Sequence, residues 1–440
     1  MNIDIPENVK YIIETLEACG FEAYAVGGCI RDSLKGIFPH DWDICTSATP
    51  KEVKVSFPDN CIIETGIKHG TVTIVLNNEN FEITTYRTEG RYSDGGHLDN
   101  VSFTASLTED LSHRDFTVNA MAYNHRKGLV DPYSGEKDLQ NGILRCVGNP
   151  CERFGEDPLR ILRALRFVST QNLQIEALTD EAIFAFKHDI LIMPEERIKA
   201  EFEKMLLGSN VRKVLMDYKK IIATFIPEIE PCFNFNQNNP SHAYDVWEHT
   251  AESIQKAKRD RIVRLVMFFH DIGKPHCYIE DICDVGHFYG HGIRSAEMTE
   301  DIMKRLRFDS NTINTVTTLV KYHDNFIEES PNAIRRLLNK IGEENLRYLF
   351  DIREADVLAQ NTEYLKPRLD KLSELRAIAD NIIAERQCFS IKDLAVNGND
   401  LIELGYKPGL EIGEKLKELL EVVINNPKMN IKETLIKLIA

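Results

Sequence analysis

The segment VGGCIRDSLKGIFPHDWDI, Val26 to Ile44, combines a glycine pair, an arginine and two aspartates. The residues AYAV just before the glycines are typical of a β-strand, and CIRDSLKG is typical of a short helix. Gly27 and Gly28 allow the backbone to approach a ligand closely, and the free N–H groups of a helix start can bind phosphate. Arg31, one turn into the helix, adds a charged donor. The segment therefore predicts a phosphate-binding turn.

Asp41 and Asp43 are separated by one residue, as are side chains that share one face of a β-strand. Neighbouring carboxylates repel each other unless cations lie between them, and Mg²⁺ prefers carboxylate oxygens together with substrate phosphates. Glu82, in the strand-like stretch FEITTYR, can join them from a neighbouring strand. A solvated surface loop is the alternative, but the combined pattern favours Mg²⁺ bound by Asp41, Asp43 and Glu82, with the two aspartates as the catalytic pair.

The composition is that of an ordinary globular protein of 440 residues, with 43% apolar and 28% charged residues. Because no run approaches the roughly 20 apolar residues of a membrane span, and the first residues do not form a signal peptide, we expect no membrane partner. The ten cysteines are scattered, which favours reduced thiols and a cytoplasmic location. A net charge of −16 argues against a general nucleic-acid coat but permits a local basic groove.

Secondary-structure signals change along the chain from mixed to helical. The stretches GTVTIVL, FEITTYR and FTVNAMAYN predict strands, whereas helical periodicity begins at EDPLRILRALRF and continues to the end. An asparagine-rich stretch at residues 231–242 predicts a boundary. We therefore expect an α+β protein, an α/β head followed by a long all-α body. The predicted domains are 1–145 (head), 146–235 (helical neck), 240–360 (a second catalytic unit) and 361–440 (helical tail).

Four motifs, VGGCIRD…HDWDI, SHRDFTVNAMAYN, DPYSGEKDL and GEDPLRILRALRF, occur in this order over roughly residues 20–230. They resemble the successive motifs of bacterial class II tRNA nucleotidyltransferases, the CCA-adding enzymes and their relatives, the bacterial poly(A) polymerases. The resemblance implies a head like that of DNA polymerase beta and a helical neck, body and tail that hold tRNA. It also implies triphosphate contacts at Gly28 and Arg31, and metal-binding carboxylates at Asp41 and Asp43.

The arginine–aspartate–phenylalanine motif of this family falls on Arg114, Asp115 and Phe116, and Arg114 is expected to bind the nucleotide. The chain departs from the family at His113, where many members have a second arginine. It also departs in the loop GRYSDGGHLDNVSF, where Gly96 and Leu98 replace an arginine and a proline. That loop helps the family to switch nucleotides, so a CCA-adding enzyme, an A-adding enzyme and a poly(A) polymerase all remain open. The presence of a loop between Thr88 and Phe103 argues against an enzyme that adds only the two C residues.

The family selects its nucleotide with protein side chains, and the selecting motif falls on EDPLR. Asp157 can only accept hydrogen bonds when ionised and Arg160 can only donate them. Cytosine and adenine present an amino group beside a ring-nitrogen acceptor, whereas uracil and guanine present a carbonyl there.

On a helix, Asp157, Arg160 and Arg163 span about 120° and can share a site, while Arg166 lies about 180° from Asp157. We therefore expect Arg166 to contact phosphate or a structural partner.

A second set of motifs, VWEHT, FFHDIGKP, GHFYGHG, VKYHD and READVLAQ, lies in the helical half. Histidines and aspartates on successive helices can form a metal site that activates water for phosphate hydrolysis. The motifs resemble the HD superfamily of metal-dependent phosphohydrolases, and the resemblance implies a divalent transition metal. The implied ligands are His249, His270, Asp271, His291, His323 and Asp356. His287 and Asp324 are alternatives for the fourth and last positions.

Three functions follow as hypotheses. The leading one is template-independent addition of C and A to tRNA 3′ ends from CTP and ATP, by phosphoryl transfer that releases pyrophosphate, in an enzyme that acts on tRNA and not on DNA. The second treats the HD half as the principal activity, a phosphohydrolase of 2′,3′-cyclic phosphates or 2′-phosphates at RNA ends, with an inactive head. The third is an RNA-binding protein without catalysis, which does not explain the clustered carboxylates. The sequence leaves open whether the HD half is catalytically active, and it leaves the oligomeric state open.

Overall fold

The computed structural model describes residues 3–64, 66–89, 92–93, 97–98, 101–240 and 242–439. The chain forms two compact units, Met1–Pro227 and Glu228–Ala440, which we call the N-terminal and C-terminal units. The division lies four residues before the asparagine-rich stretch. Gly96, in the loop that departs from the family, lies outside the described residues. Each described helix falls short of a membrane span, either in length or in apolar character.

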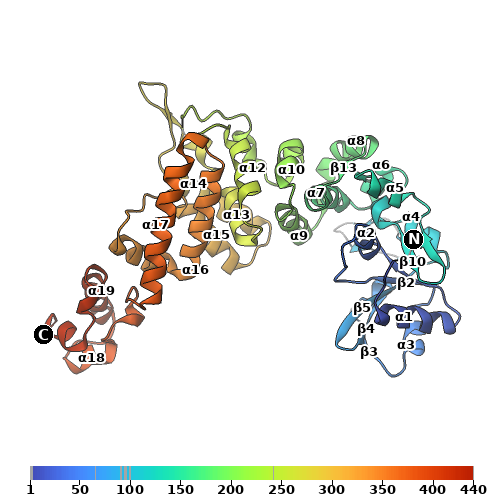
Figure 1. Cartoon of the computed structure of the whole chain (residues 1–440), viewed down its shortest axis with the longest axis horizontal. Coiled ribbons are helices and arrows are strands. Elements are labelled where there is room, and N and C mark those ends of the chain that lie inside the picture. Colours follow the sequence, from blue (N-terminus) through green and yellow to red (C-terminus); the bar gives the residue numbers. More distant parts are fainter. Residues whose placement is uncertain are drawn as a thin grey trace. The chain divides into compact units, whose positions relative to one another are not determined.

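The N-terminal unit contains a mixed sheet followed by helices (Figure 1). Its strands are β1 (Ala23–Val26), β2 (Ile44–Thr46), β3 (Cys61–Ile63), β4 (Thr71–Leu76), β5 (Glu79–Thr85), β6 (Arg87–Glu89), β7 (Tyr92–Ser93), β8 (His97–Leu98), β9 (Val101–Phe103), β10 (Ala122–Asn124), β11 (Gly128–Val130), β12 (Ile143–Leu144) and β13 (Gln174–Ile175). Its helices are α1 (Glu7–Ala18), α2 (Gly28–Leu34), α3 (Pro50–Ser56), η1 (Ile67–His69), α4 (Leu107–Ser112), η2 (Thr117–Asn119), α5 (Gly135–Gln140), α6 (Pro150–Glu156), α7 (Leu159–Gln171), α8 (Ala177–Phe186), η3 (Lys187–Ile192), α9 (Glu195–Leu206), α10 (Val211–Asp217) and α11 (Lys219–Phe225).

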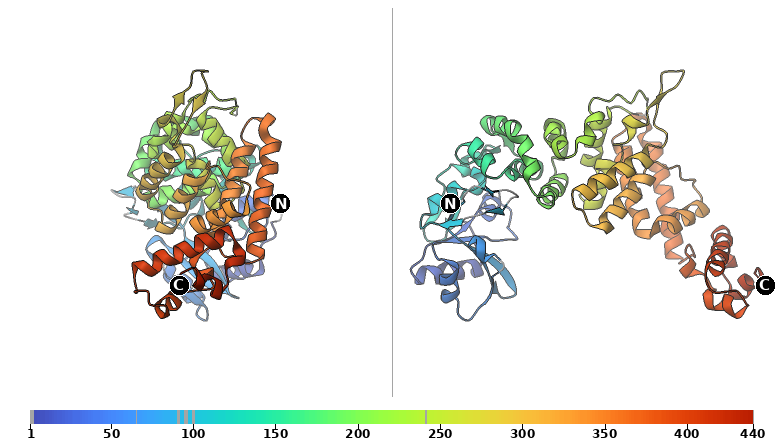
Figure 2. Two further views of the ribbon diagram at one scale, coloured as in Figure 1. Left: turned by 90° about the vertical axis from the view of Figure 1, so that its left-hand side faces the viewer. Right: turned by 180° about the vertical axis from the view of Figure 1, so that it is seen from behind.

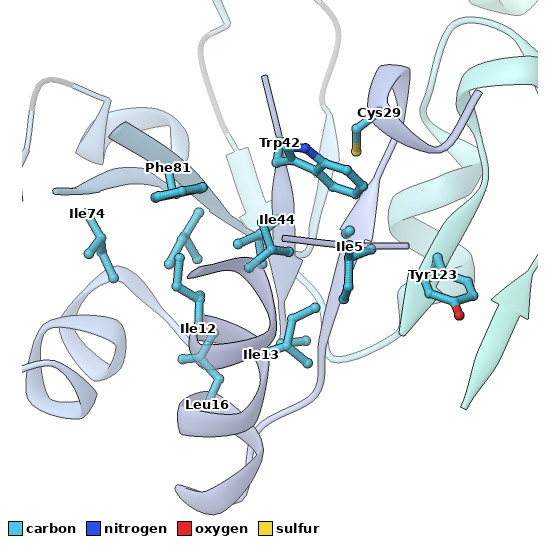
Figure 3. Close-up of a cluster of buried hydrophobic side chains, with 14 of the residues drawn as sticks. Ile5, Ile12, Ile13, Leu16, Cys29, Trp42, Ile44, Ile74, Phe81 and Tyr123 are labelled. Atoms are coloured by element: carbon cyan, nitrogen blue, oxygen red, sulfur yellow. The ribbon is translucent and has the colours of Figure 1, made fainter. Parts of the chain in front are cut away.

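The main sheet has seven strands in the order β11-β10-β1-β2-β5-β4-β3. All neighbouring pairs are antiparallel except β2 and β5, which run parallel. One face is covered by α1, whose Ile12, Ile13 and Leu16 pack in a common core with Ile44 and Ile74 of the sheet (Figure 3). Side chains alternate between the faces of a strand, so the polar residues between these apolar ones point to the opposite face.

Trp42 fixes the direction of the two aspartates beside it. Its ring is buried in the core under the sheet (Figure 3). Asp41 and Asp43 on either side are exposed. This alternation directs both carboxylates away from the core, as the sequence predicts. Both aspartates, however, precede β2 rather than lie within it, because the strand begins at Ile44. The prediction that they lie inside a strand was therefore wrong.

The predicted strand FTVNAMAYN is a strand only at its end. Thr117–Asn119 form the 3₁₀ turn η2, and β10 begins at Ala122. The β-branched residues of this stretch favour extended structure locally, but side-chain hydrogen bonds override the preference. The Thr117 hydroxyl donates to Asp138 at 2.8 Å, and the Asn119 amide donates to Asp115 at 3.1 Å.

The C-terminal unit is helical apart from one short hairpin (Figure 2). The 3₁₀ helix η4 (Pro227–Cys232) leads into it, and its elements are α12 (Val246–Lys256), α13 (Arg261–Phe269), η5 (Lys274–His276), β14 (Ile279–Glu280), β15 (Gly286–His287), α14 (His291–Arg305), α15 (Ser310–Tyr322), α16 (Pro331–Leu358, interrupted at Gly342), η6 (Thr362–Tyr364), α17 (Leu365–Ala384), η7 (Ile391–Asp393), α18 (Gly398–Glu403), α19 (Leu410–Asn425), η8 (Pro427–Met429) and α20 (Lys432–Lys437). The β14–β15 hairpin and the single short strand β13 are departures from the predicted all-α body.

Candidate functional site

The N-terminal unit contains a cavity of about 600 Å³, which we call the head pocket. It opens on the face of the sheet opposite α1, between the sheet and α7. The sequence-predicted residues that line it are Gly27, Gly28, Arg31, Asp43, Glu82, Arg114, Asp157, Arg160, Arg163 and Arg166. Asp41 is exposed and is not among the described residues of the lining. Residues from five separate stretches of sequence therefore share one cavity.

Asp43, which directly precedes β2, and Glu82 of β5 occupy equivalent places beside the parallel β2–β5 pair. Ile44 pairs with Ile83 in the β2–β5 register, so the residues that precede them lie side by side on the pocket face. Partial burial in the pocket raises the pKa of Asp43, the negative charges of Glu82 and Asp41 raise it further, and Arg114 opposes them. Mutual repulsion of this kind is what a bound cation relieves. Asp43 and Glu82 therefore offer carboxylate oxygens of the kind that Mg²⁺ prefers.

The glycine turn connects β1 to α2 at the pocket wall. Gly27 has φ of 83°, a conformation that L side chains rarely adopt. A Cβ at this position would lie 3.1 Å from Nη1 of Arg114, so the glycine also makes room for that guanidinium. The Val26 amide donates to the carbonyl of Asp43 at 2.9 Å and joins the turn to the aspartate segment.

A hydrogen-bonded network runs beneath the pocket from α2 to α7. Arg31 Nη1 donates to Asn119 Oδ1 at 2.7 Å, and Asn119 Nδ2 donates to Asp115 Oδ1 at 3.1 Å. Arg163 then donates to Asp115 Oδ2 from Nε at 2.8 Å and from Nη2 at 2.6 Å. Burial alone would raise the pKa of Asp115, but Arg163 and the hydrogen bonds from Asn119 and Phe116 lower it to about 2. Asp115 is thus a charged anchor for residues on both sides of the pocket.

Arg114 is held from the opposite side, by Asp110. Its Nη2 donates to Asp110 Oδ2 at 3.3 Å, and the amide of Arg87 donates to the other oxygen of Asp110 at 3.1 Å. The guanidinium therefore lies between the glycine turn and the end of α4. From there it can contact an anion in the pocket.

Asp157 and Arg160 meet in the pocket, but not as the helical-wheel prediction expected. Asp157 follows α6 in an extended conformation, with φ of −139° and ψ of 97°, and α7 begins only at Leu159. Pro158 is the reason, because a residue before proline disfavours the helical region. Asp157 Oδ1 accepts a hydrogen bond from the Leu159 amide at 3.0 Å and so caps α7. Arg160 is buried and donates to the carbonyl of His113 at 2.9 Å.

Arg166 has the structural partner that its position predicted. Its Nε donates to Glu201 of α9 at 2.6 Å, and its guanidinium lies 4.1 Å from the centre of the Phe167 ring. His113, the residue that departs from the family, also lines the pocket; its backbone holds Arg160, and its Nδ1 lies 3.4 Å from Arg153.

The sequence analysis missed several pocket residues, among them Asp110, Asn119 and Arg197. Asn119 connects Arg31 to Asp115, and Arg197 contacts Asp157 Oδ2 at 3.4 Å. Asn119 lies within the motif SHRDFTVNAMAYN, so its presence there was a usable signal. Arg197 lies 40 residues from Asp157, and no local pattern connects the two.

The C-terminal unit contains a second cavity of about 560 Å³, which we call the helical pocket. The ends of several helices bring histidines and aspartates together at its base. His249 lies on α12, His270 and Asp271 follow α13, His291 begins α14, and His323 follows α15. Two sets of potential ligand atoms, His249–His270–Asp271 and Asp271–His291–His323, each lie within 4.8 Å of one another.

The four histidine rings are each oriented by the same kind of contact. In each ring, Nδ1 lies within hydrogen-bonding distance of a backbone carbonyl: Ala359 (3.3 Å), Met267 (2.8 Å), Phe288 (2.8 Å) and Val320 (2.7 Å). Because a carbonyl only accepts, Nδ1 donates in each ring, and Nε2 is the atom that can bind a metal when the ring is neutral. All four Nε2 atoms lie 3.2–3.7 Å from a carboxylate oxygen of Asp271. Outer hydrogen bonds of this kind orient histidine ligands at metal sites.

Asp271 lies at the centre of this cluster. Nε2 of His270 and both carboxylate oxygens of Asp271 are buried and lack a well-formed hydrogen bond among the described residues. Burial alone would raise the pKa of Asp271, but His270 and Lys274 bring it well below its usual range. Lys274 Nζ lies 2.7 Å from Asp271 Oδ2, whereas Asp271 Oδ1 and His270 Nε2 remain able to bind a ligand. The donor set of imidazole nitrogens and a carboxylate fits a divalent transition metal.

The remaining predicted ligands differ in position. Asp356 Oδ1 lies 2.9 Å from His249 Nε2 and 3.8 Å from His270 Nε2, at the edge of the cluster. The alternative Asp324 is largely exposed and 4.0 Å from His291 Nε2. The alternative His287 is paired with Asp281 at 2.9 Å, away from the central carboxylate. The geometry therefore favours His323 and Asp356 over the two alternatives.

Three stretches of the chain match described families. Residues 23–145 match "Poly A polymerase head domain", and residues 292–439 match "tRNA nucleotidyltransferase domain 2". Residues 172–233 match "Probable RNA and SrmB- binding site of polymerase A". The match in the C-terminal unit is thus to a tRNA nucleotidyltransferase domain, and the HD superfamily assignment stays a prediction.

Similar proteins extend over nearly the whole chain. The CCA-adding enzyme of Lactobacillus helveticus is 33% identical over 97% of this chain and 94% of its own length. That of Ligilactobacillus salivarius is 32% identical over 99% and 96%. Among solved structures, the Bacillus stearothermophilus CCA-adding enzyme in complex with CTP covers 96% of this chain and 94% of its own, with a TM-score of 0.70 and 28% identity. The chain belongs to the class II family of CCA-adding enzymes and poly(A) polymerases.

Proposed function

We propose that this protein adds C, C and A to the 3′ ends of tRNA from CTP and ATP without a nucleic-acid template. The observation that supports this most strongly is the head pocket. It joins a carboxylate pair, a glycine turn, several arginines and the EDPLR motif in one cavity, in a chain whose relatives are CCA-adding enzymes. The reaction is attack of the RNA 3′-hydroxyl on the α-phosphate of the nucleotide, with pyrophosphate as the leaving group.

Asp41, Asp43 and Glu82 would hold Mg²⁺ on the face of the sheet opposite α1. The cation, when bound, supplies a lower pKa for the attacking hydroxyl and neutralises charge on the leaving pyrophosphate. Asp43 and Glu82 lie side by side because the residues that follow them, Ile44 and Ile83, are paired in the β2–β5 register. Asp41 is directed to the same face by the buried Trp42.

The triphosphate would lie against the glycine turn. Gly27 and Gly28 leave the backbone free of side-chain bulk, and Arg31 and Arg114 bring positive charge to the same wall. Arg31 is already oriented by Asn119, and Arg114 by Asp110. Preorganised donors of this kind stabilise the charge that develops during phosphoryl transfer.

Asp157 and Arg160 would read the base. The carboxylate of Asp157 accepts a hydrogen bond from the exocyclic amino group of cytosine or adenine, and it repels the carbonyl oxygen of uracil or guanine. Arg160 would donate to the neighbouring ring nitrogen. Arg163 and Arg166 are held by Asp115 and Glu201, so they support the wall of the pocket from α7.

The test uses radiolabelled tRNA transcripts that end before the tail, at its first C, and at CC. Each is incubated with the protein, Mg²⁺, and CTP, ATP or both. Ordered addition of C, C and A that then stops supports the proposal. Addition of A alone to the CC end would indicate an A-adding enzyme, and a long adenosine ladder a poly(A) polymerase. No extension of any transcript would contradict the proposal.

The helical pocket supports a second function, a metal-dependent phosphohydrolase of the HD type acting on RNA-end phosphates. The observation that favours it is the convergence of four Nε2 atoms on Asp271 beneath a wall of positive charge. The cations of that wall are Lys274, Lys321, Arg353, Arg368 and Lys371. Arg368 and Lys371 lie on α17, so the predicted 361–440 tail contributes to this pocket.

Hydrolysis of 2′,3′-cyclic and 2′-phosphorylated oligonucleotides tests this second function. The protein is first loaded with Mn²⁺, Co²⁺, Ni²⁺ or Zn²⁺, and bound metal is counted by mass spectrometry. Bound metal with phosphate release supports a hydrolase. Bound metal without release indicates a degenerate HD domain, and no bound metal contradicts the metal assignment.

A further inference from the structure

The base-reading carboxylate of Asp157 is held at both oxygens. Oδ1 accepts the Leu159 amide at 3.0 Å, and Oδ2 lies 3.4 Å from Nη2 of Arg197. The side chain of Asp157 is 9% exposed, so the hydrogen bonds from these two donors largely determine where its oxygens point. The first anchor belongs to the backbone of α7. The second is a side chain from another helix.

Arg197 occupies an unusual place for a cation. It lies in the first turn of α9, where the helix dipole disfavours positive charge. The carboxylate of Asp157 compensates for this. One turn further along α9, Glu201 pairs with Arg166 of α7 at 2.6 Å. Two oppositely directed ion pairs on one face of α9 therefore fix Arg197 over the start of α7.

The other arginines of the EDPLR region make different contacts. Arg160 donates to the carbonyl of His113 at 2.9 Å, and Arg163 donates to Asp115 at 2.6 Å. Arg197 is 36% exposed and lines the head pocket beside Asp157. It is therefore placed to act on the carboxylate oxygen that faces an incoming base.

We propose that Arg197 is a specificity-determining residue, which orients Asp157 so that Oδ2 meets the amino group of cytosine or adenine. This rests on the proposed function of Asp157 in base reading. A carboxylate rejects uracil and guanine only while one oxygen is held where their carbonyl must lie. Without Arg197 the carboxylate keeps only its Oδ1 anchor, and Oδ2 can rotate away from a carbonyl. Discrimination is then lost more than catalysis.

The experiment measures kcat/KM for single additions of CTP and UTP to a transcript without its tail, and of ATP and GTP to one that ends in CC. Arg197→Ala, Arg197→Lys and the control Glu196→Ala are compared with the unmodified chain. Glu196 is exposed, lies in the same turn of α9 and is not among the described residues of the pocket lining. Thermal unfolding of every variant checks that it folds.

We expect Arg197→Ala to lower the CTP/UTP and ATP/GTP ratios on the order of tenfold, the scale of one hydrogen bond to a charged group. Arg197→Lys should recover part of the ratio, and Glu196→Ala should keep it. Unchanged ratios, or an equal loss for all four nucleotides, would overturn the inference, because a purely structural role lowers every rate alike. If Arg197→Ala fails to fold, the CTP/UTP and ATP/GTP ratios of Arg197→Lys test the inference in its place. Failure of the unmodified chain to add C or A would instead overturn the proposed function.

Discussion

Arg163 and Asp115 form a close ion pair, with Nη2 and Nε of the arginine 2.6 Å and 2.8 Å from one carboxylate oxygen. The pair joins the long neck helix α7 to the turn that follows α4, and through Asn119 it extends to Arg31 beside the glycine turn. The glycine turn with Arg31 and the helix α7 are thus connected by one buried carboxylate. The stability of the head is therefore expected to depend on Asp115.

The pKa of Asp115, lowered to about 2, predicts how stability depends on acidity. The pKa is lower in the folded than in the unfolded chain, so the stabilisation is fully present above about pH 4 and is lost as the pH falls towards about 2. Asp115→Asn should lower the free energy of unfolding by about 2 kcal/mol at pH 7 and by much less at pH 2. Denaturant unfolding across this range checks it. A pH-independent difference would contradict the assignment.

Loss of either catalytic aspartate should stop nucleotide addition. Asp41→Ala and Asp43→Ala are each expected to lower kcat on the order of 10³-fold, since each removes a ligand for the charge-stabilising cation. Single-nucleotide CTP incorporation provides the measurement. Asp59→Ala, at an exposed aspartate outside the pocket, is the matched control. Normal extension by Asp41→Ala would remove that residue from the catalytic pair.

Gly27→Ala should impair nucleotide binding as well as stability. Gly27 has φ of 83° and ψ of −128°, outside the left-handed helical region, so alanine there should cost on the order of 1–3 kcal/mol of backbone strain, and Gly20, with φ of 89°, is the control for a positive φ. A Cβ at Gly27 also meets Arg114 at 3.1 Å, whereas a Cβ at Gly20 meets no described atom within 4 Å. Only Gly27→Ala should therefore raise KM for CTP. Equal KM values for the two variants would show that the contact with Arg114 does not matter.

Metal binding in the C-terminal unit should be separable from nucleotide addition. His270→Ala is expected to reduce the bound transition metal, counted by mass spectrometry, because it removes one of the four Nε2 atoms around Asp271. The rate of C addition should not change, because the two pockets share no described residue. His276→Ala, at an exposed histidine nearby, should keep its metal. Retention of the full metal content by His270→Ala would contradict the ligand assignment.

Much of the head was predictable because its site depends on local patterns. The order of strand, glycine pair, helix and paired aspartates lies within Val26–Ile44, and the α+β class with a helical body is confirmed. Asp157, Arg160 and Arg163 share one pocket as predicted, but Asp157 precedes α7 instead of lying on it, because Pro158 disfavours a helical conformation at the residue before it. Propensity alone also misplaced a strand over Thr117–Asn119.

Other features depend on tertiary packing that no local pattern contains. Arg31 reaches Asn119 across 88 residues, and Arg197 reaches Asp157 across 40. Both contacts depend on how elements distant in sequence pack together. In the helical pocket, the ligand types were readable from the sequence, but the shared orientation of the histidine rings depends on backbone carbonyls such as Met267, which any residue could supply.

The double role of Asp157 has a consequence for mutational robustness. The same carboxylate caps α7 and lines the head pocket, so helix stability and the proposed base reading depend on one side chain. A random replacement there gives up a helix cap, worth about 1 kcal/mol, together with the proposed ability to reject the wrong base. Asparagine can still cap but brings an amide donor into the site. A replacement that cannot cap the helix would thus need stability gained elsewhere in the head, whereas asparagine would change the base contact at little cost in stability.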